Sequence, residues 1–312
     1  MKKTLLLGIC AISAVVNAGP REDGLFISHV HRGGGKFERP DNTLETFLWC
    51  WGNGSALECD CRLTADGVGI MFHDNTLKRT PRGIPDSWKK RKVGTMKWDE
   101  LRDIDVGSYL SPEYASHRIP RIEAVFAAMV GHPSYLLFVD EKGIGPKRIA
   151  EEARKFGVID QIYYSGPSYQ NILTWNEAVP GGKSMFWIGA FPKNDSPEEA
   201  ARTRQHFEKI MAEVRAADFK YITVAVIHTY YYPEKADPFL LTTPYLKSLI
   251  DEFHAHGVKV SSIPFHGGEL PEVYYKLWDL GCDGFVTDYP SVMFQVIKDL
   301  KSKAKDGVKA VN

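Results

Sequence analysis

The feature that most constrains the fold is a regular alternation of short apolar runs with longer segments of helical periodicity. The apolar runs predict eight strands, at residues 25–30, 56–60, 135–140, 161–165, 184–188, 220–226, 258–264 and 283–287. Between most of them lie predicted helices, at residues 43–52, 121–131, 146–156, 168–178, 197–217, 243–256 and 270–280. Eight mostly apolar strands with intervening helices predict an α/β fold, a parallel (β/α)8 TIM barrel, with an open doubly wound sheet as the alternative.

The first eighteen residues have the pattern of a secretory signal peptide. A lysine pair precedes an apolar run, and the small residue Ala18 offers a cleavage site. The run is too short to span a membrane, and Cys10 lies inside it without the small preceding residue that a lipoprotein signal needs. We therefore expect a signal peptide at 1–18, a single domain at 19–312, and a secreted or periplasmic protein.

The charge balance and the cysteines of the expected mature chain limit its partners. The leader holds two of the 39 basic residues, so 37 remain against 39 acidic ones, and this argues against a nucleic-acid partner, which needs a basic field. No later apolar stretch is long enough to cross a membrane. The remaining cysteines are too few for a disulfide scaffold, and we expect buried thiols rather than an oxidised pair at Cys50, Cys59, Cys61 and Cys282.

One segment, ECDCRLTADGVGIMFHD at 58–74, interrupts the alternation with two extended runs around the Asp-Gly pair at 66–67. Asp-Gly is a strong signal for a two-residue hairpin turn, and a turn there places Asp60 opposite His73. Glu58 and Asp60 share a face because strand side chains alternate. The sequence therefore predicts a hairpin after the second strand in which Glu58, Asp60 and His73 converge. Three ionisable side chains on mostly apolar strands cost free energy, which a bound ligand would offset.

The stretch at 75–120 has little periodicity and several breakers, which predicts a small insertion at the barrel mouth. It contains the basic run WKKRK at 88–92. A solvated basic face is the ordinary interpretation of such a run. Steering of anionic substrates, or transient contact with a lipid surface, is the alternative.

Carboxylates close two of the predicted strands, at the edge where barrels of this class carry their active sites. Glu58 and Asp60 end the second strand, and Asp140 ends the third. Alternation sends Glu141, the next residue, to the opposite face. Three clustered carboxylates repel one another unless a hard divalent cation binds them, and the lack of ligands at zinc spacing favours Mg²⁺ or Ca²⁺.

Basic side chains stand at the same strand ends. His31 and Arg32 follow the first strand directly, and Lys142 shares a face with Asp140. Arg32 and Lys142 beside a metal imply an anionic group on a small-molecule substrate, most simply a phosphate. His31 and His73 are the candidates for a base and an acid on opposite sides of a phosphorus centre.

Residues that flank these candidates are less distinctive. The three glycines at 33–35 would let the backbone approach a phosphate. Asn42 and Glu45 fit a capping box at the start of the first helix. His228 and His266 lie near later strand ends, where a structural role is more common than a substrate contact.

The motifs are similar to those of the glycerophosphodiester phosphodiesterase family over nearly the whole expected mature chain. HRGGGKFERPDNTLETF resembles the family's opening motif, with Asp41 in place of the usual glutamate. LECDCRLTADGVGIMFHDNTLKRT resembles its Glu-x-Asp and His-Asp motif, while RIPRIEAVF and GCDGFVTDYPSVM resemble two later stretches. The resemblance implies a (β/α)8 barrel with metal-dependent phosphodiesterase activity that splits a glycerophosphodiester into glycerol phosphate and an alcohol.

The resemblance also implies roles for individual residues, although the chain departs from the family pattern in two places. The implied catalytic pair is His31 and His73, the implied phosphate contact is Lys142 beside Arg32, and the implied metal ligands are Glu58, Asp60 and Asp140. Asp140 is one methylene shorter than the usual glutamate. The segment SSIPFHGGE at 261–269 stands where the family often has an aromatic-rich stretch that shapes the alcohol pocket. The identity of the alcohol that is released therefore stays undetermined.

Two other functions stay open at this stage. A sphingomyelinase D-like lyase has a similar two-histidine barrel with an aspartate as third ligand, and it would release a cyclic phosphate. A non-catalytic barrel that binds a phosphate ligand is the other alternative, and a complete histidine pair argues against it.

Overall fold

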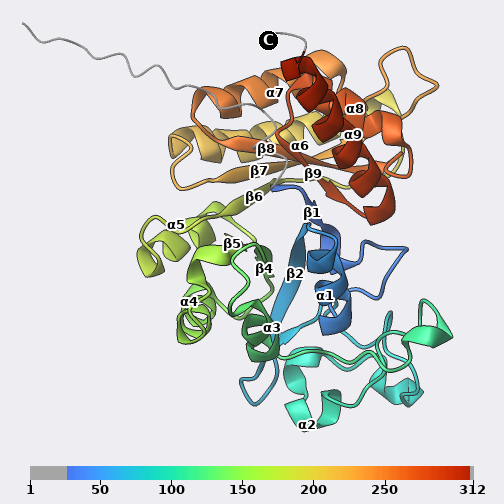
Figure 1. Ribbon diagram of the computed structural model, residues 1–312, viewed down its shortest axis with the longest axis vertical. Coiled ribbons are helices and arrows are strands. Elements are labelled where there is room, and N and C mark those ends of the chain that lie inside the picture. Colours follow the sequence, from blue (N-terminus) through green and yellow to red (C-terminus); the bar gives the residue numbers. More distant parts are fainter. Residues whose placement is uncertain (1–26, 310–312) are drawn as a thin grey trace, which may run out of the picture.

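A computed structural model describes residues 27–309, with side chains described as far as residue 303. The strands are β1 (His29–Val30), β2 (Ala56–Leu63), β3 (Gly69–Met71), β4 (Leu137–Glu141), β5 (Ile162–Ser165), β6 (Met185–Ile188), β7 (Val224–Tyr230), β8 (Lys259–His266) and β9 (Gly284–Thr287). The α-helices are α1 (Leu44–Gly52), α2 (Trp98–Leu101), α3 (Ile122–Met129), α4 (Pro146–Lys155), α5 (Tyr169–Ala178), α6 (Pro197–Ala216), α7 (Thr243–Ala255), α8 (Pro271–Leu280) and α9 (Pro290–Lys309) (Figure 1).

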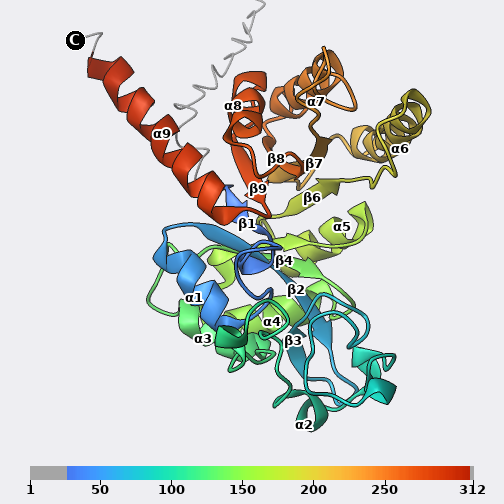
Figure 2. The same cartoon turned by 90° about the vertical axis from the view of Figure 1, so that its right-hand side faces the viewer.

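These elements form a nearly closed (β/α)8 barrel, which confirms the predicted fold. The eight parallel strands follow one another in the order β5, β4, β2, β1, β9, β8, β7, β6, and β3 adds to β2 as an antiparallel hairpin partner. The two ends of this order, β5 and β6, meet at a single bridge between Tyr164 and Ser184. The helices wrap the outside of the strands (Figure 2), and this closed arrangement excludes the open doubly wound sheet.

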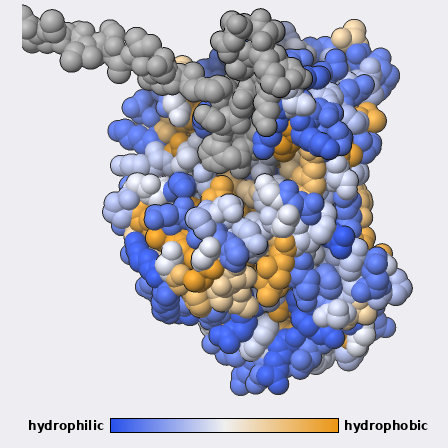
Figure 3. All heavy atoms as spheres, viewed as in Figure 1, coloured by the Kyte–Doolittle hydropathy of each residue, from blue (hydrophilic) through white to orange (hydrophobic). Residues whose placement is uncertain are grey.

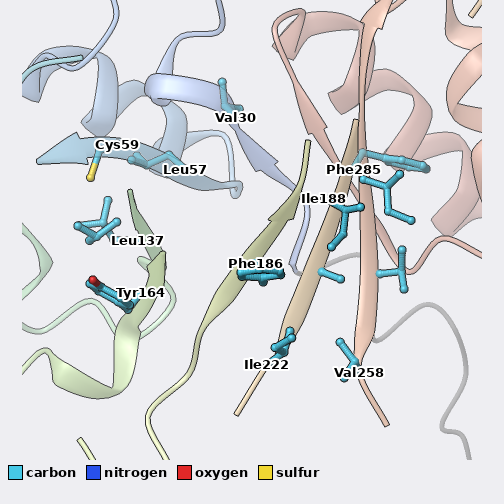
Figure 4. Packing of buried hydrophobic residues seen from close by; sticks show 14 of the residues in the cluster. Val30, Leu57, Cys59, Leu137, Tyr164, Phe186, Ile188, Ile222, Val258 and Phe285 are labelled. Atoms are coloured by element: carbon cyan, nitrogen blue, oxygen red, sulfur yellow. The ribbon is translucent and has the colours of Figure 1, made fainter. Parts of the chain in front are cut away.

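Side-chain alternation along the strands divides the core into two layers. The barrel interior is filled by residues of the strands and their approaches: Ile27, Ala56, Phe138, Tyr163, Met185, Val224, Val226, Ile263 and Val286. A larger cluster lies between the strands and the helices, and Figure 4 labels Val30, Leu57, Cys59, Leu137, Tyr164, Phe186, Ile188, Ile222, Val258 and Phe285 from it. The four expected thiols are buried and form no disulfide within the described chain, as predicted.

The hairpin after β2 forms, but its register differs by one residue from the predicted one. Cys61 pairs with Met71, and the Phe72 amide donates to the Asp60 carbonyl oxygen at 2.9 Å. Asp60 therefore lies opposite Phe72, and the predicted pairing of Asp60 with His73 is wrong. His73 follows directly after the paired strands.

The turn itself explains this shift. The Thr64 amide donates to the Val68 carbonyl at 3.0 Å, which closes a three-residue loop instead of a two-residue one, and the Thr64 hydroxyl also accepts the Val68 amide. Gly67 occupies the left-handed position of that loop, with φ at 78°. A three-residue loop with glycine at that position is the next most common hairpin connection, and Asp-Gly alone does not distinguish it from the two-residue form.

The sixth predicted strand begins later than expected, and the described chain ends in a helix that was not predicted. β7 begins at Val224 rather than at residue 220, because the backbone turns through positive φ at Asp218, Phe219 and Tyr221. The last helix, α9, follows β9 and was not among the predicted helices. Its buried face is carried by Met293, Val296 and Leu300, an apolar spacing typical of a helix.

The insertion at 75–120 is irregular, as predicted, and shares a small core with the β3 hairpin: Ile70, Phe72, Leu77, Val93, Met96, Leu101, Ile104, Val106 and Ile119. In its basic run, Lys89 pairs with Asp86 and Arg91 pairs with Glu100, as in a solvated basic face. On the face seen in Figure 3, hydrophilic residues cover most of the helix layer and hydrophobic residues show in patches.

The expectations about membrane spans and about export concern different parts of the chain. In the described part of the chain, no helix has the length and apolar character needed to cross a bilayer. The expected signal peptide at 1–18, with Cys10, lies outside the described residues.

Candidate active site

Three carboxylates meet where the end of β4 pairs with the middle of β2. Glu58, Asp60 and Asp140 each offer an oxygen within 4.8 Å of the others, and Asp60 and Asp140 are paired in the parallel ladder. Glu58 and Asp60 are each 1% exposed. Burial and the charge of Asp60 raise the pKa of Glu58 to about 8, and burial raises the pKa of Asp140 to about 6 despite Lys142. Such repulsion between buried acids is what a bound cation relieves, so this group could hold a metal ion.

Backbone and amide groups from the β1–α1 loop hold the acidic group in place. Arg32 adopts a left-handed conformation with φ at 54°, and its amide donates to Glu58 at 2.8 Å. The Asn42 side chain donates to the Asp60 carboxylate at 2.9 Å and accepts the Asp60 amide at 2.9 Å. Asn42 is thus committed to Asp60, and the predicted capping box with Glu45 does not form; Thr43 is the residue before α1.

Lys142 lies on the site face, as alternation along β4 predicts. Its ammonium is 2.6 Å from Asp140 and 3.6 Å from Asp60. Although burial alone would lower the pKa of Lys142, these carboxylates raise it. Glu141 turns its carboxylate to the loop that follows, where it accepts the amides of Gly143 and Gly145.

The catalytic candidate His31 is oriented by a carboxylate from the far end of the chain. Its Nδ1 lies 2.7 Å from Asp288, which follows β9, and its Nε2 lies 4.0 Å from Glu58. Burial would lower the pKa of His31, but Asp288 raises it above the ordinary value. A carboxylate in this position fixes the tautomer of an imidazole that acts as a general acid or base.

His73 is held by a chain of ion pairs that leads through Arg79 and Asp41 to Arg32. Its Nδ1 lies 2.6 Å from Asp74, whose other oxygen accepts from Arg79 at 2.8 Å. Arg79 also donates to Asp41 at 2.8 Å, and Asp41 accepts from Tyr109 of the insertion. The shorter residue at position 41, which departs from the family pattern, is therefore part of the support for His73.

One cavity of about 590 Å³ contains these groups at the carboxyl ends of the strands. Its opposite wall is aromatic and comes from β6, β7, β8 and the loop after β6: Trp187, Phe191, His228 and Phe265. The Phe265 ring centre lies 6.4 Å from that of His31 and 4.5 Å from that of His228. Burial lowers the pKa of His228 to about 4, so this imidazole is neutral near pH 7.

The family model of the glycerophosphoryl diester phosphodiesterase family matches residues 31–292, which is most of the chain. The chain belongs to this family. Its members are phosphoric diester hydrolases, and this enzyme class applies to the chain.

Individual members of the glycerophosphoryl diester phosphodiesterase family are similar over different lengths. A putative glycerophosphodiester phosphodiesterase of Bacillus subtilis is 31% identical over 87% of this chain and 96% of its own. Human glycerophosphodiester phosphodiesterase 1 is 25% identical over 44% of this chain, and the match spans only 40% of that protein. A solved Oleispira antarctica phosphodiesterase in complex with the product sn-glycerol-3-phosphate has a TM-score of 0.62 at 19% identity, covering 88% of this chain and 98% of that one, which shows a shared fold.

The structure brings the predicted site residues of this family member together, although their roles stay predictions. The cavity is lined by His31, Arg32, Asp60, His73, Asp140 and Lys142, and Glu58 completes the acidic group behind them. Of the two later histidines, His228 lines the cavity, whereas His266 directs Nδ1 to the Tyr231 carbonyl. Sequence reasoning did not find Asp288, Asn42 or the aromatic wall, because their contacts join distant segments.

Proposed function

We propose that this protein hydrolyses a glycerophosphodiester to glycerol phosphate and an alcohol in a metal-dependent reaction with two-histidine acid–base catalysis. The observation that carries the proposal is the meeting of the buried acidic group with His31 and His73 in one cavity. The complex of the Oleispira antarctica phosphodiesterase with sn-glycerol-3-phosphate supports the choice of substrate class.

The acidic group fits a hard divalent cation. Glu58, Asp60 and Asp140 supply only oxygen ligands, and their side chains are largely withdrawn from water. Mg²⁺ and Ca²⁺ prefer such ligands, and either ion would offset the burial and the mutual repulsion that raise the pKa values of Glu58 and Asp140. When bound, the ion would polarise a phosphoryl oxygen and neutralise charge that develops there.

The side chains around that group would perform the remaining work. Arg32 and Lys142 would hold the phosphate through charge-assisted hydrogen bonds. One histidine of the pair would take the proton of the nucleophile, a water molecule or a neighbouring substrate hydroxyl. The other would give a proton to the leaving alcohol oxygen as its bond to phosphorus breaks.

A turnover assay with and without a chelator tests this proposal. We expect exhaustive chelation to abolish hydrolysis of glycerophosphocholine and added Mg²⁺ or Ca²⁺ to restore it. Full activity after chelation would remove the metal from the mechanism. Phosphorus NMR of the products would separate hydrolysis from release of a cyclic phosphate, and binding without turnover would favour a phosphate-binding barrel.

We further propose that the enzyme acts outside the cytoplasm, as a secreted or periplasmic protein. The pattern of residues 1–18 supports this location. N-terminal sequencing of the protein from its native host should begin just after Ala18, and an intact N-terminus would contradict the proposal.

A further inference from the structure

The two candidate histidines are held by different parts of the chain. The Nδ1 atom of His31 contacts Asp288, which directly follows β9 of the barrel. The Nδ1 atom of His73 contacts Asp74, whose second oxygen accepts a hydrogen bond from Arg79 of the insertion. His31 therefore takes its orientation from the barrel itself, whereas the restraint on His73 continues into the insertion.

Asp41, in the loop between β1 and α1, binds two arginines at the same time. Arg79 donates to both of its oxygens, at 2.8 and 3.4 Å, and Nη1 of Arg32 donates to one of them at 3.2 Å. Asp41 is 7% exposed, and a carboxylate withdrawn from water to this degree needs such donors. One buried carboxylate thus holds the candidate phosphate contact directly and His73 through Arg79 and Asp74.

Tyr109 of the insertion makes two hydrogen bonds to Asp41. Its hydroxyl donates to Oδ1 of the carboxylate and accepts the backbone amide of the same residue at 3.1 Å. Burial and the charge of Asp41 raise the pKa of Tyr109, so the hydroxyl keeps its proton and remains a donor at neutral pH. Asp105 orders the loop that carries Tyr109, because its carboxylate accepts the amides of Gly107 and Ser108 at 2.9 and 3.0 Å.

The segments of the insertion that carry Arg79 and Tyr109 are joined to each other. The Arg82 guanidinium donates to the Arg79 carbonyl oxygen at 2.7 Å, and the Arg82 amide donates to the Asp105 carbonyl oxygen at 2.9 Å. The same guanidinium lies over the Tyr109 ring, 5.8 Å from its centre. Arg79 and Tyr109 therefore reach Asp41 from one connected unit.

We infer that the insertion positions His73 and Arg32 for catalysis through a set of contacts called here the insertion bracket, formed by Asp41, Asp74, Arg79 and Tyr109. The inference rests on the proposed function, which gives His73 the acid or base role and Arg32 the phosphate contact. The cavity lining in the described chain includes His73 and Arg32 but none of the four bracket residues. These four are therefore positioning residues, and Tyr109 makes the insertion part of the catalytic apparatus.

A pair of tyrosine variants tests the insertion bracket. Tyr109→Phe removes only the hydroxyl that contacts Asp41. We expect kcat for glycerophosphocholine to fall about tenfold, because even a 1 Å misplacement of a reacting group costs on the order of a hundredfold and the rest of the bracket remains. Tyr245→Phe removes a hydroxyl that donates to Glu208 at 2.7 Å between α7 and α6, outside the cavity lining, and should leave kcat unchanged. An unchanged kcat in Tyr109→Phe would overturn the inference.

A double-mutant cycle separates positioning from a general structural role. If Tyr109 acts through His73, Tyr109→Phe should lower kcat in the wild type and cause no further fall in the His73→Ala background, because the group that it positions is then absent. An equal fall in both backgrounds would show a structural defect and would overturn the inference.

Nitrogen NMR of the two imidazoles tests the bracket without turnover. Asp41→Asn removes the charge that holds Arg79, so we expect the ring nitrogen shifts of His73 to move toward those of a free imidazole. The shifts of His31, which Asp288 holds, should stay and so report an intact fold. Unchanged His73 signals would overturn the inference. Changed signals, together with full activity of His73→Ala, would support the bracket and overturn the catalytic role that the proposed function gives to His73.

Discussion

The two walls of the cavity are built on different physical principles. The polar wall, formed by β1, β2 and β4, holds buried charges, and each is fixed by a named partner: Asn42 on Asp60, Asp288 on His31 and Asp140 on Lys142. The aromatic wall, formed by β6, β7 and β8, is held by ring packing such as that of Phe265 on His228. Buried charge is costly unless each group is paired, so the polar wall has little freedom to vary.

The aromatic wall carries no such constraint. An aromatic ring can be exchanged for another apolar side chain at the cost of packing alone, whereas a carboxylate of the polar wall cannot be moved without stranding its partner. We propose a division of labour in which the polar wall performs the chemistry and the aromatic wall selects the substrate. The predictions below test this division.

The largest expected effect separates two adjacent carboxylates of β4. Asp140→Ala should weaken binding of Mg²⁺ or Ca²⁺ by at least about a hundredfold, because even residues that only support metal ligands are worth ten- to a hundredfold. Glu141→Ala should leave metal affinity nearly unchanged, since that carboxylate accepts loop amides instead. Isothermal titration calorimetry measures both. If the Glu141 variant loses the metal, the assignment of faces along β4 is off by one residue.

The second prediction compares the two walls directly. His31→Ala should lower kcat at least about a hundredfold, the low end for loss of a general acid or base. Phe265→Leu, whose ring faces His31 across the cavity, should act mainly on KM. Steady-state kinetics on glycerophosphocholine distinguishes the two patterns. If the Phe265 variant shows the same fall in kcat as the His31 variant, the proposed division between chemistry and substrate selection is wrong. Circular dichroism of both proteins controls for misfolding.

The sequence predicted the polar wall well and the aromatic wall poorly, for physical reasons. Strand ends of a parallel barrel share one edge, so Glu58, Asp60 and Asp140 could be grouped from alternation alone. Asp288 could not be linked to His31, 257 residues away, because the closure of β9 onto β1 is a tertiary event.

The aromatic wall lacks a sequence signal of this kind. Phe265 lies in SSIPFHGGE, the segment that departs from the family pattern, and an apolar residue at a strand end looks the same as a core residue. The one-residue error in the hairpin register likewise arose because an Asp-Gly pair fits two turn lengths. Local sequence patterns therefore predicted the candidate reacting groups, whereas the aromatic wall that faces them could be identified only from the folded structure.

The third prediction concerns the neutral histidine of the aromatic wall. Burial lowers the pKa of His228 to about 4, against about 6.5 in the unfolded chain. Its contribution to stability is therefore complete above pH 6.5 and is lost as the pH falls toward 4, because the unfolded state then binds the additional proton. Between pH 7 and pH 4.5 the loss should be roughly 2 to 2.5 kcal/mol, on the order of sixtyfold in the unfolding equilibrium.

Urea unfolding at pH 7 and at pH 4.5 measures this contribution. His228→Phe removes the titrating group and keeps an aromatic ring, so the free energy of unfolding of the variant should fall less between the two pH values. Any part that His29, another buried imidazole with a lowered pKa, contributes to the fall is common to both proteins. Equal falls in the wild type and the variant would contradict the neutral state of His228.

The smallest expected effect tests whether the polar wall extends beyond the acidic group. Asp288 contacts His31 and, on this proposal, positions the imidazole. Asp288→Asn keeps an oxygen that can accept the Nδ1 proton but removes the charge, so kcat should fall about tenfold, less than for loss of the histidine itself. KM should stay unchanged, since the side chain is paired with His31 inside the wall. A merely structural role would instead lower the thermal unfolding temperature and the concentration of active enzyme. Active-site titration with unfolding measurements on Asp288→Asn and Asp288→Ala separates the cases, and a higher KM with an unchanged kcat would assign Asp288 to substrate binding rather than to the orientation of His31.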